Sequence, residues 1–204
     1  MASQISHIIY ARKYLEKHPM PNGDADLFLL GCVFPDIRRI DDTIKRKDTH
    51  LCFDSLDLNF AGMAPFIAGW KFHLYCDMKR EEILNKYGFY ELDNAANHWH
   101  LPAKILEDEL IYNEYNNWEK LISFFNNAPY FDAGIGVTPE TFSLWYAILA
   151  KYMEKKPDDR TMHVCLSKQI NLAEKADEIV KTIDKLRKNE KVRRLLKKVA
   201  EEII

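Results

Sequence analysis

Apolar residues along the chain recur every three to four positions, which is the period of an amphipathic α-helix. Alternation of apolar and polar residues, which marks a half-buried strand, is poorly represented. The helical period covers residues 3–18, 24–34, 59–87, 101–127, 138–155, 161–188 and 190–203. The pattern therefore predicts an all-α fold, built as a bundle of seven or eight helices.

Proline, glycine and capping residues separate these segments. Pro35 ends the second segment, which places Asp36 at its C-terminal edge. Pro65 predicts a bend within residues 59–87. In that segment Gly69 lies one turn before His73, where we expect a larger side chain to crowd the imidazole ring.

Length and charge add to this description. With 204 residues the chain is expected to form a single domain, in which residues 161–204 are amphipathic helices packed on a bundle formed by residues 1–160. The net charge of −2 gives no reason to expect stable binding of nucleic acid. Residues 181–204 are locally basic, and we expect this helix to dock on the bundle with a solvated basic face.

The N-terminal residues and the cysteines indicate the compartment. No basic segment followed by an apolar one opens the chain, so no secretion signal is recognised. No apolar run reaches the roughly 18 residues that a bilayer span needs. The cysteines form no CxxC pair, which favours free buried thiols: Cys32, Cys52, Cys76 and Cys165. These features predict a cytoplasmic protein.

Potential metal ligands are concentrated in the first part of the chain: His7, Asp36, His50, His73 and Asp77. His73 and Asp77 are four residues apart, which places an imidazole and a carboxylate on one face of a helix. Imidazole and carboxylate together form the ligand sets of zinc, iron and manganese sites. These residues therefore predict a site for a divalent metal.

Each of these residues also has a structural interpretation. A single histidine on a helix is more often a core residue than a ligand, and the five side chains could form a buried hydrogen-bond network. The metal interpretation depends on convergence, because buried carboxylates without a cation destabilise the fold or take up a proton. Coordination of a metal ion would keep several such groups together.

The same residues carry a resemblance to a family. His7, the segment Leu30-Gly31-Cys32-Val33-Phe34-Pro35-Asp36, Thr49-His50 and the segment from Gly69 to Asp77 resemble the bacterial zinc-dependent phospholipase C family, whose fold fungal single-strand nucleases share. The resemblance covers about the first 80 residues. It implies an all-α phospholipase C/nuclease-like fold and a zinc site that hydrolyses phosphodiester or phospholipid bonds.

The resemblance also implies roles for individual residues. Asp36, His50, His73 and Asp77 would hold one metal, while His7 would bind a second ion that Asp77 bridges to the first. Asp77 and His50 become the candidate catalytic residues. The further ligands of the family are only partly matched, by His98 and His100 with Glu107 in place of a later glutamate. We therefore expect one or two ions, zinc first, with iron, nickel or manganese as alternatives.

The predicted function is a metal-dependent hydrolase acting on a phosphoester-containing small molecule or a phospholipid head group. Asp54, Asp57 and His100 are candidate general acids, and Lys71 and Arg38 are candidate contacts for an anion. The alternative is a non-catalytic helical binding protein that keeps a structural or degenerate metal site. An HD-domain phosphohydrolase would need an adjacent His-Asp dipeptide, which the sequence lacks.

Overall fold

The described part of the chain is entirely helical. The computed structural model describes residues 4–51, 53, 55–92 and 100–204, and no β-strand occurs among them. Its α-helices are α1 (Gln4–Lys17), α2 (Asn22–Val33), α3 (Arg46–Thr49), α4 (Pro65–Lys86), α5 (His100–Ile111), α6 (Trp118–Asn126), α7 (Pro139–Met153), α8 (Asp159–Ser167), α9 (Ala176–Lys188) and α10 (Glu190–Glu202). Short 3₁₀ helices link some of them: η1 (Phe34–Arg39), η3 (Tyr112–Glu114) and η4 (Ala173–Lys175). The predicted all-α, single-domain architecture is confirmed for these residues.

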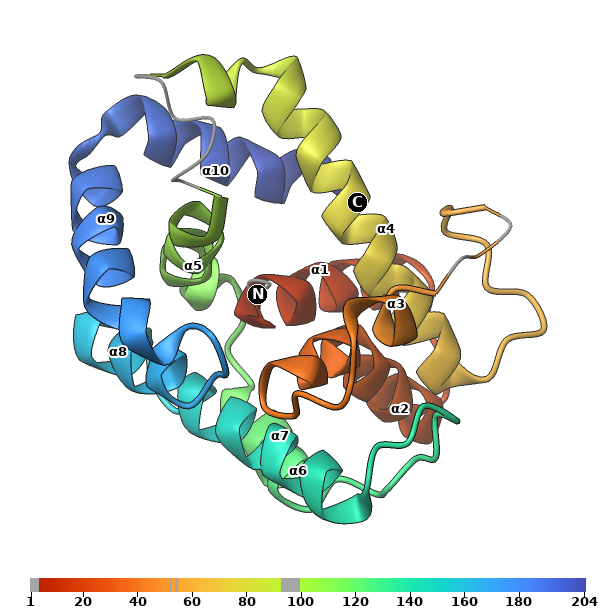
Figure 1. Cartoon of the computed structure of the whole chain (residues 1–204). Helices are drawn as coiled ribbons and strands as arrows, with labels where there is room; N and C mark the ends of the chain where they lie inside the picture. Colours follow the sequence, from red (N-terminus) through yellow and green to blue (C-terminus); the bar gives the residue numbers. More distant parts are fainter. Residues whose placement is uncertain (1–3, 52, 54, 93–99) are drawn as a thin grey trace.

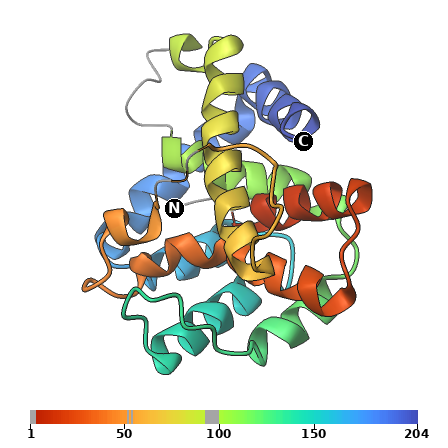
Figure 2. The same ribbon diagram turned by 90° about the vertical axis from the view of Figure 1, so that its right-hand side faces the viewer.

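Helices α1 and α5 lie in the middle of the molecule, and the other helices surround them (Figure 1). Helix α4 runs along the molecule, so that its first half crosses α2 and its second half lies beside α10 (Figure 2). Ten of the residues of α1 are buried, which fits its central place. The side chains of α1, α4 and α5 therefore meet in the interior.

Helices α2 and α4 cross at two glycines. A Cβ atom added to Gly31 would lie 2.0 Å from the carbonyl oxygen of Phe66, and one added to Gly69 would lie 2.0 Å from that of Phe28. Any side chain at either position would therefore push the two helices apart. The crowding that we predicted around Gly69 does exist, but it comes from the α2 backbone and not from the ring of His73.

The start of α4 corrects the sequence prediction. Residues 59–87 were expected to be one helix bent at Pro65, whereas the helix begins at Pro65 itself. Proline lacks the N–H that an interior helical residue would donate, and its fixed φ suits the first helical position. Gly62, with φ of +75°, lies in the turn before the helix and adopts a conformation that other residues rarely take.

The segment predicted as one helix over residues 101–127 is divided between α5, η3 and α6. At the break, the carbonyl of Tyr112 accepts a 3₁₀-type bond of 3.4 Å from the N–H of Tyr115 and a second bond of 3.2 Å from the indole N–H of Trp118. The rings of Tyr112 and Trp118 also stack, with centroids 4.8 Å apart. The side chain of Trp118 thus stabilises a turn that a search for helical period does not reveal.

The segment predicted over residues 161–188 is also divided, into α8, η4 and α9. Asn171 has φ of +65°, a left-handed conformation that interrupts a helix. The neighbouring N–H of Ile170 donates to the carbonyl of Arg39 over 2.7 Å. The break thus ties the C-terminal third of the chain to η1.

The start of α7 agrees with the sequence prediction. Thr138 caps this helix, because its Oγ1 accepts from the N–H of Thr141.

The C-terminal helices pack on the central ones, α9 on α5 and α10 on both α4 and α5. The apolar side of α10 is buried, as at Val192, Leu196 and Val199, while most of its lysines and arginines face solvent. Cys32, Cys76 and Cys165 are buried free thiols, as predicted, and Cys52 lies outside the described residues. Within the described residues, no helix combines the length and the apolar character required to cross a bilayer.

A buried carboxylate joins α1 to α5. Asp108 Oδ1 accepts hydrogen bonds of 2.8 Å from the N–H and the hydroxyl of Ser6, and its Oδ2 accepts one of 3.2 Å from Tyr152. Burial raises the pKa of Asp108 to about 7, and the nearby charge of Glu107 acts in the same direction. The folded protein therefore keeps this proton to a higher pH than the unfolded chain does.

This proton makes the stability of the protein fall as the pH rises. The folded state binds more protons than the unfolded state between about pH 4 and 7, so the free energy of unfolding decreases through that range. Asp108→Asn cannot ionise and is expected to remove this decrease, which raises the free energy of unfolding at pH 7 by up to about 4 kcal/mol. Urea unfolding at several pH values measures the slope. The exposed Glu119→Gln is the control, and equal slopes in the two variants would contradict the assignment.

Candidate metal centre

Three of the five predicted ligands come together where α1 meets α4. His7 on α1 and His73 and Asp77 on α4 have ligand atoms that all lie within 4.8 Å of one another, and we call these residues the metal triad. Asp77 follows His73 by four residues, so both side chains project from the same face of α4, as predicted. His7 reaches them because α1 packs on α4.

The distances in the metal triad approach those of a coordinated ion. His7 Nε2 lies 3.9 Å from Asp77 Oδ1, and His73 Nε2 lies 3.8 Å from Asp77 Oδ2. Two ligands of a tetrahedral zinc ion are separated by about 3.3 Å, given bonds of about 2.0 Å. The two imidazole rings are stacked, with centroids 4.1 Å apart. Because the lone pair of each ring nitrogen lies in its ring plane, the stacked rings would have to turn as well as shift to bring all three ligand atoms onto one ion.

The tautomer of His73 is fixed by its hydrogen bond to α2. Its Nδ1 lies 2.8 Å from the carbonyl oxygen of Cys32, which can only accept, so Nδ1 carries the hydrogen. The opposite atom, Nε2, is buried and has no hydrogen-bond partner among the described residues. The lone pair of Nε2 therefore stays unused, and Nε2 lies 3.8 Å from Asp77 Oδ2. A histidine oriented through its second nitrogen is the usual arrangement of a metal ligand.

The protonation states in the metal triad also suit a cation. Burial lowers the pKa of His73 to about 3, with the adjacent His7 acting in the same direction. Burial alone would raise the pKa of Asp77, but Lys104 and the two histidines outweigh it and hold that pKa well below its usual range. At neutral pH the site therefore offers an unprotonated Nε2 and an ionised carboxylate.

Asp36 lies near the metal triad but bonds to other groups. Its Oδ2 accepts a hydrogen bond of 2.8 Å from Gln4, and its Oδ1 lies 3.7 Å from both Arg38 Nη2 and Arg39 Nε. Asp36 is buried in η1, immediately after α2, as its place beside Pro35 predicted. The structure thus puts this carboxylate at the edge of the site with two cations beside it.

His50 follows the short helix α3 and faces His73 edge-on, with ring centroids 6.4 Å apart. The preceding residue fixes this segment, because the indole N–H of Trp70 donates to the carbonyl of Thr49 over 2.6 Å. The Thr49 hydroxyl also contacts His50 Nδ1 at 3.1 Å. Partial burial, followed by the charge of Arg46, lowers the pKa of His50 to about 4. His50 is therefore neutral at physiological pH and lies next to the metal triad.

Two other predicted ligands, His100 and Glu107, are not part of the metal triad. His98 is outside the described residues, as is Asp54. His100 begins α5, is half exposed, and contacts Tyr90 and Glu81. Glu107 is fully buried in an ion pair with Arg80 Nε at 2.8 Å and also accepts a hydrogen bond from Tyr10, so these partners already use its two oxygens.

Of the two candidate anion contacts, Lys71 is bonded to other groups and Arg38 lies near the metal triad. Lys71 is buried, and its Nζ donates to Asp57 Oδ1 over 2.7 Å and to the carbonyl of Asn59 over 3.0 Å. Asp57 is thereby held in an ion pair, and its pKa is lowered to about 2 by the hydrogen bond from Lys71. Arg38 lies beside Asp36, so it is the predicted cation that the structure does place near the metal triad.

The sequence analysis missed one neighbour of the metal triad. Lys104 on α5 donates from Nζ to Asp77 Oδ1 over 2.6 Å, and its side chain is 14% exposed. The family resemblance would place a glutamate four residues after His100, where this chain has Lys104. The usable signal was a lysine within an otherwise apolar stretch of α5, one turn after His100.

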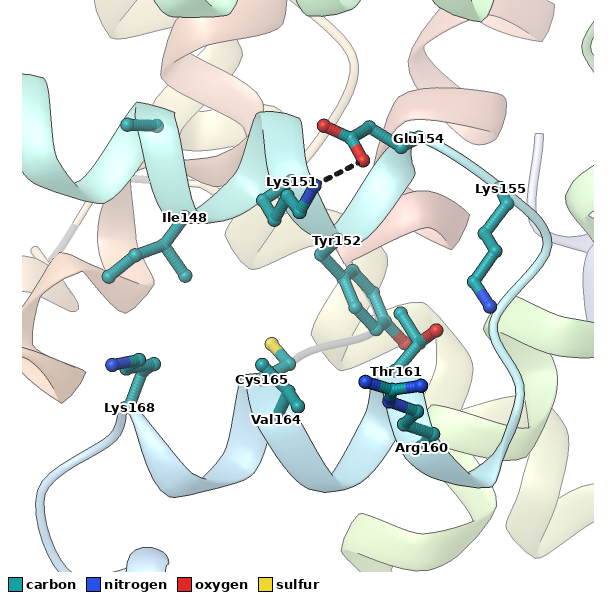
Figure 3. A pocket seen from close by; sticks show the side chains of 11 residues that line it. Ile148, Lys151, Tyr152, Glu154, Lys155, Arg160, Thr161, Val164, Cys165 and Lys168 are labelled. Carbon is teal, nitrogen blue, oxygen red and sulfur yellow. Dashed lines mark hydrogen bonds and ion pairs between the residues drawn. The ribbon is translucent and has the colours of Figure 1, made fainter.

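A pocket on another side of the molecule is separate from this centre. It has a volume of about 500 Å³ and lies between α7 and α8, where side chains such as Ile148 and Val164 face each other across the gap (Figure 3). Lys151, Lys155 and Arg160 line its rim. No residue of the metal triad borders it, so pocket size does not point to the same place as the ligand chemistry.

Comparison of the chain with protein-family models, with curated proteins and with solved structures finds no match. The function is therefore inferred from the geometry of the metal triad and from the residues around it.

Proposed function

We propose that this protein is a metal-dependent hydrolase of phosphoesters, in which His7, His73 and Asp77 hold a divalent ion. The observation that carries the proposal is His73 Nε2, a buried nitrogen with an unused lone pair that lies close to the ligand atoms of His7 and Asp77. A buried polar atom without a partner costs about 1–3 kcal/mol. A metal ion would satisfy it, and zinc fits a ligand set of two imidazoles and one carboxylate.

The three protein ligands leave further positions on such an ion, as catalytic zinc sites do. Bound there, a divalent ion would polarise a phosphoryl oxygen and make a water molecule acidic enough to ionise near neutral pH. His50, neutral and next to the metal triad, is the residue placed to accept a proton. Asp36 holds Arg38 and Arg39 at the edge of the site.

The charges around the metal triad support an anionic substrate. Arg38, Arg39 and Lys104 supply three cations near two carboxylates, Asp36 and Asp77. The arginine and lysine side chains are between 14% and 18% exposed, so their charges are only partly screened by solvent. A phosphodiester or a phospholipid head group is the substrate class that such a surplus of positive charge favours.

The activity assay uses the whole chain, stripped with chelator and reloaded with Zn²⁺ or Mn²⁺. Hydrolysis of bis-p-nitrophenyl phosphate is expected with metal and is expected to fall to background after chelation. His50→Ala should lower the rate by about 100-fold, the lower end for loss of a general base, while metal binding persists. His163→Ala, on the exposed side of α8, is the matched control.

Two results separate the proposal from its alternatives. Stoichiometric metal binding without hydrolysis of any phosphoester tested would favour a non-catalytic helical protein with a structural metal. If the protein binds none of Zn²⁺, Mn²⁺, Fe²⁺ and Ni²⁺, the metal triad is a buried polar network and the proposal is overturned.

A further inference from the structure

Lys104 and Asp77 form the closest ion pair within the metal centre. Lys104 Nζ lies 2.6 Å from Asp77 Oδ1, whereas the histidine nitrogens lie 3.8 and 3.9 Å from the oxygens of the same carboxylate. The two partners come from different helices, α5 and α4, and lie 27 positions apart in the sequence. Both side chains are largely shielded from solvent, with 14% and 26% exposed. The ammonium group is therefore a built part of the centre.

This ion pair divides the two oxygens of Asp77 between different partners. Oδ2 faces His73 Nε2, whereas Oδ1 accepts from the ammonium of Lys104 and lies 3.9 Å from His7 Nε2. A carboxylate that bridges two metal ions needs both oxygens for them, and the ions of such sites are about 3.5–4 Å apart. At Asp77, the position of a second ion on Oδ1 is already taken by a cation.

Among the described residues, the metal triad is the group of side chains whose ligand atoms converge closely enough to hold an ion. A charged lysine has three donors and no lone pair, so Lys104 cannot coordinate. Glu107, one turn further along α5, is committed to Arg80 and Tyr10. His7, which the family resemblance assigned to a second ion, converges with His73 on the same point. The chemistry of this donor set therefore fits one ion.

We propose that Lys104 supplies the second positive charge of the centre, so that the metal triad binds a single divalent ion. The inference rests on the metal binding in the proposed function, and it adds the number of ions and the group that replaces the second. Its ammonium stays on Asp77 and neutralises the charge that would otherwise attract another ion. Repulsion from Lys104 should also weaken the binding of the first ion.

Titration calorimetry of the chelator-treated chain with Zn²⁺, joined to metal analysis after dialysis, tests this inference. The wild type is expected to bind one ion per chain. Lys104→Met removes the charge without adding a ligand, so one ion should bind about tenfold more tightly or better. Lys104→Glu adds a carboxylate next to Asp77 and is expected to raise the stoichiometry to two. Circular dichroism shows whether each variant is folded.

Lys79→Met is the matched control, because Lys79 lies on α4 two residues after Asp77 but pairs with Glu82 at the surface. It should leave both stoichiometry and affinity unchanged. Two ions per wild-type chain would overturn the inference and leave the proposed function intact, whereas no binding would refute the proposed function. Weaker binding in a folded Lys104→Met chain would also overturn the inference, because it would show that Lys104 holds Asp77 in place for the metal.

Discussion

Replacement of His73 by alanine is expected to abolish stoichiometric binding of Zn²⁺. Loss of a residue that merely orients a ligand weakens metal affinity about 10- to 100-fold, and loss of the ligand itself should exceed that. His73 has the largest expected effect because it supplies Nε2 to the ion and, through Nδ1, ties α4 to the Cys32 carbonyl on α2. Titration calorimetry with chelator-treated protein gives the affinity directly.

The same substitution is expected to destabilise the metal-free protein. It leaves the buried carbonyl of Cys32 without its donor, which costs about 1–3 kcal/mol. Asp77→Asn keeps that bond and removes the carboxylate charge, so it tests the metal site with His73 in place. His100→Ala, a half-exposed histidine of α5, is the control and should bind zinc as the wild type does. Wild-type affinity in a folded His73→Ala protein would show that the ion binds elsewhere.

Much of the fold follows from the sequence because helices carry their own signals. Thr138 and Pro139 mark the start of α7, and the structure has both in the expected roles. The breaks inside the predicted long helices were missed because contacts outside the helical ladder stabilise them. The indole of Trp118 donates a second bond to the Tyr112 carbonyl, and the N–H of Ile170 donates to the carbonyl of Arg39 in another part of the chain. A local pattern contains no information about such partners.

The candidate site also has one part that local sequence predicts and one part that depends on tertiary packing. The spacing of His73 and Asp77 is fixed by the geometry of a single helix, so a sequence reading places them together. His7 joins them only through the packing of α1 on α4, which no spacing encodes. Lys104 was passed over because a search for metal ligands considers only groups with a lone pair. Its role depends on where α5 lies relative to Asp77.

The crossing of α2 and α4 links the fold to the metal centre. Gly31 and Gly69 let the two backbones approach, and Cys32 and His73 then join them by a hydrogen bond of 2.8 Å. The orientation of His73 Nε2 is therefore set by the distance between two helices. A change that separates them should alter stability and metal affinity together.

Gly69→Ala is accordingly expected to destabilise the protein. Its Cβ would lie 2.0 Å from the Phe28 carbonyl oxygen and 3.0 Å from the Cys32 nitrogen, both backbone atoms that no rotamer change can move away. Overpacking of this kind costs about 1–3 kcal/mol and occasionally more, and the gain in helix propensity from alanine is only about 1 kcal/mol. A net loss of up to about 2 kcal/mol is expected in urea unfolding of the metal-free protein.

Gly23→Ala provides the matched control on α2. A Cβ at Gly23 meets nothing within 4 Å, so the substitution should be neutral or stabilise the protein by up to about 1 kcal/mol. In Gly69→Ala the helices must move apart, which lengthens the bond from His73 to Cys32 and releases the ring, so zinc affinity should fall with stability. Unchanged zinc affinity in a destabilised Gly69→Ala protein would show that the metal triad is positioned independently of the crossing. His7 and Asp77 would then be sufficient to orient His73.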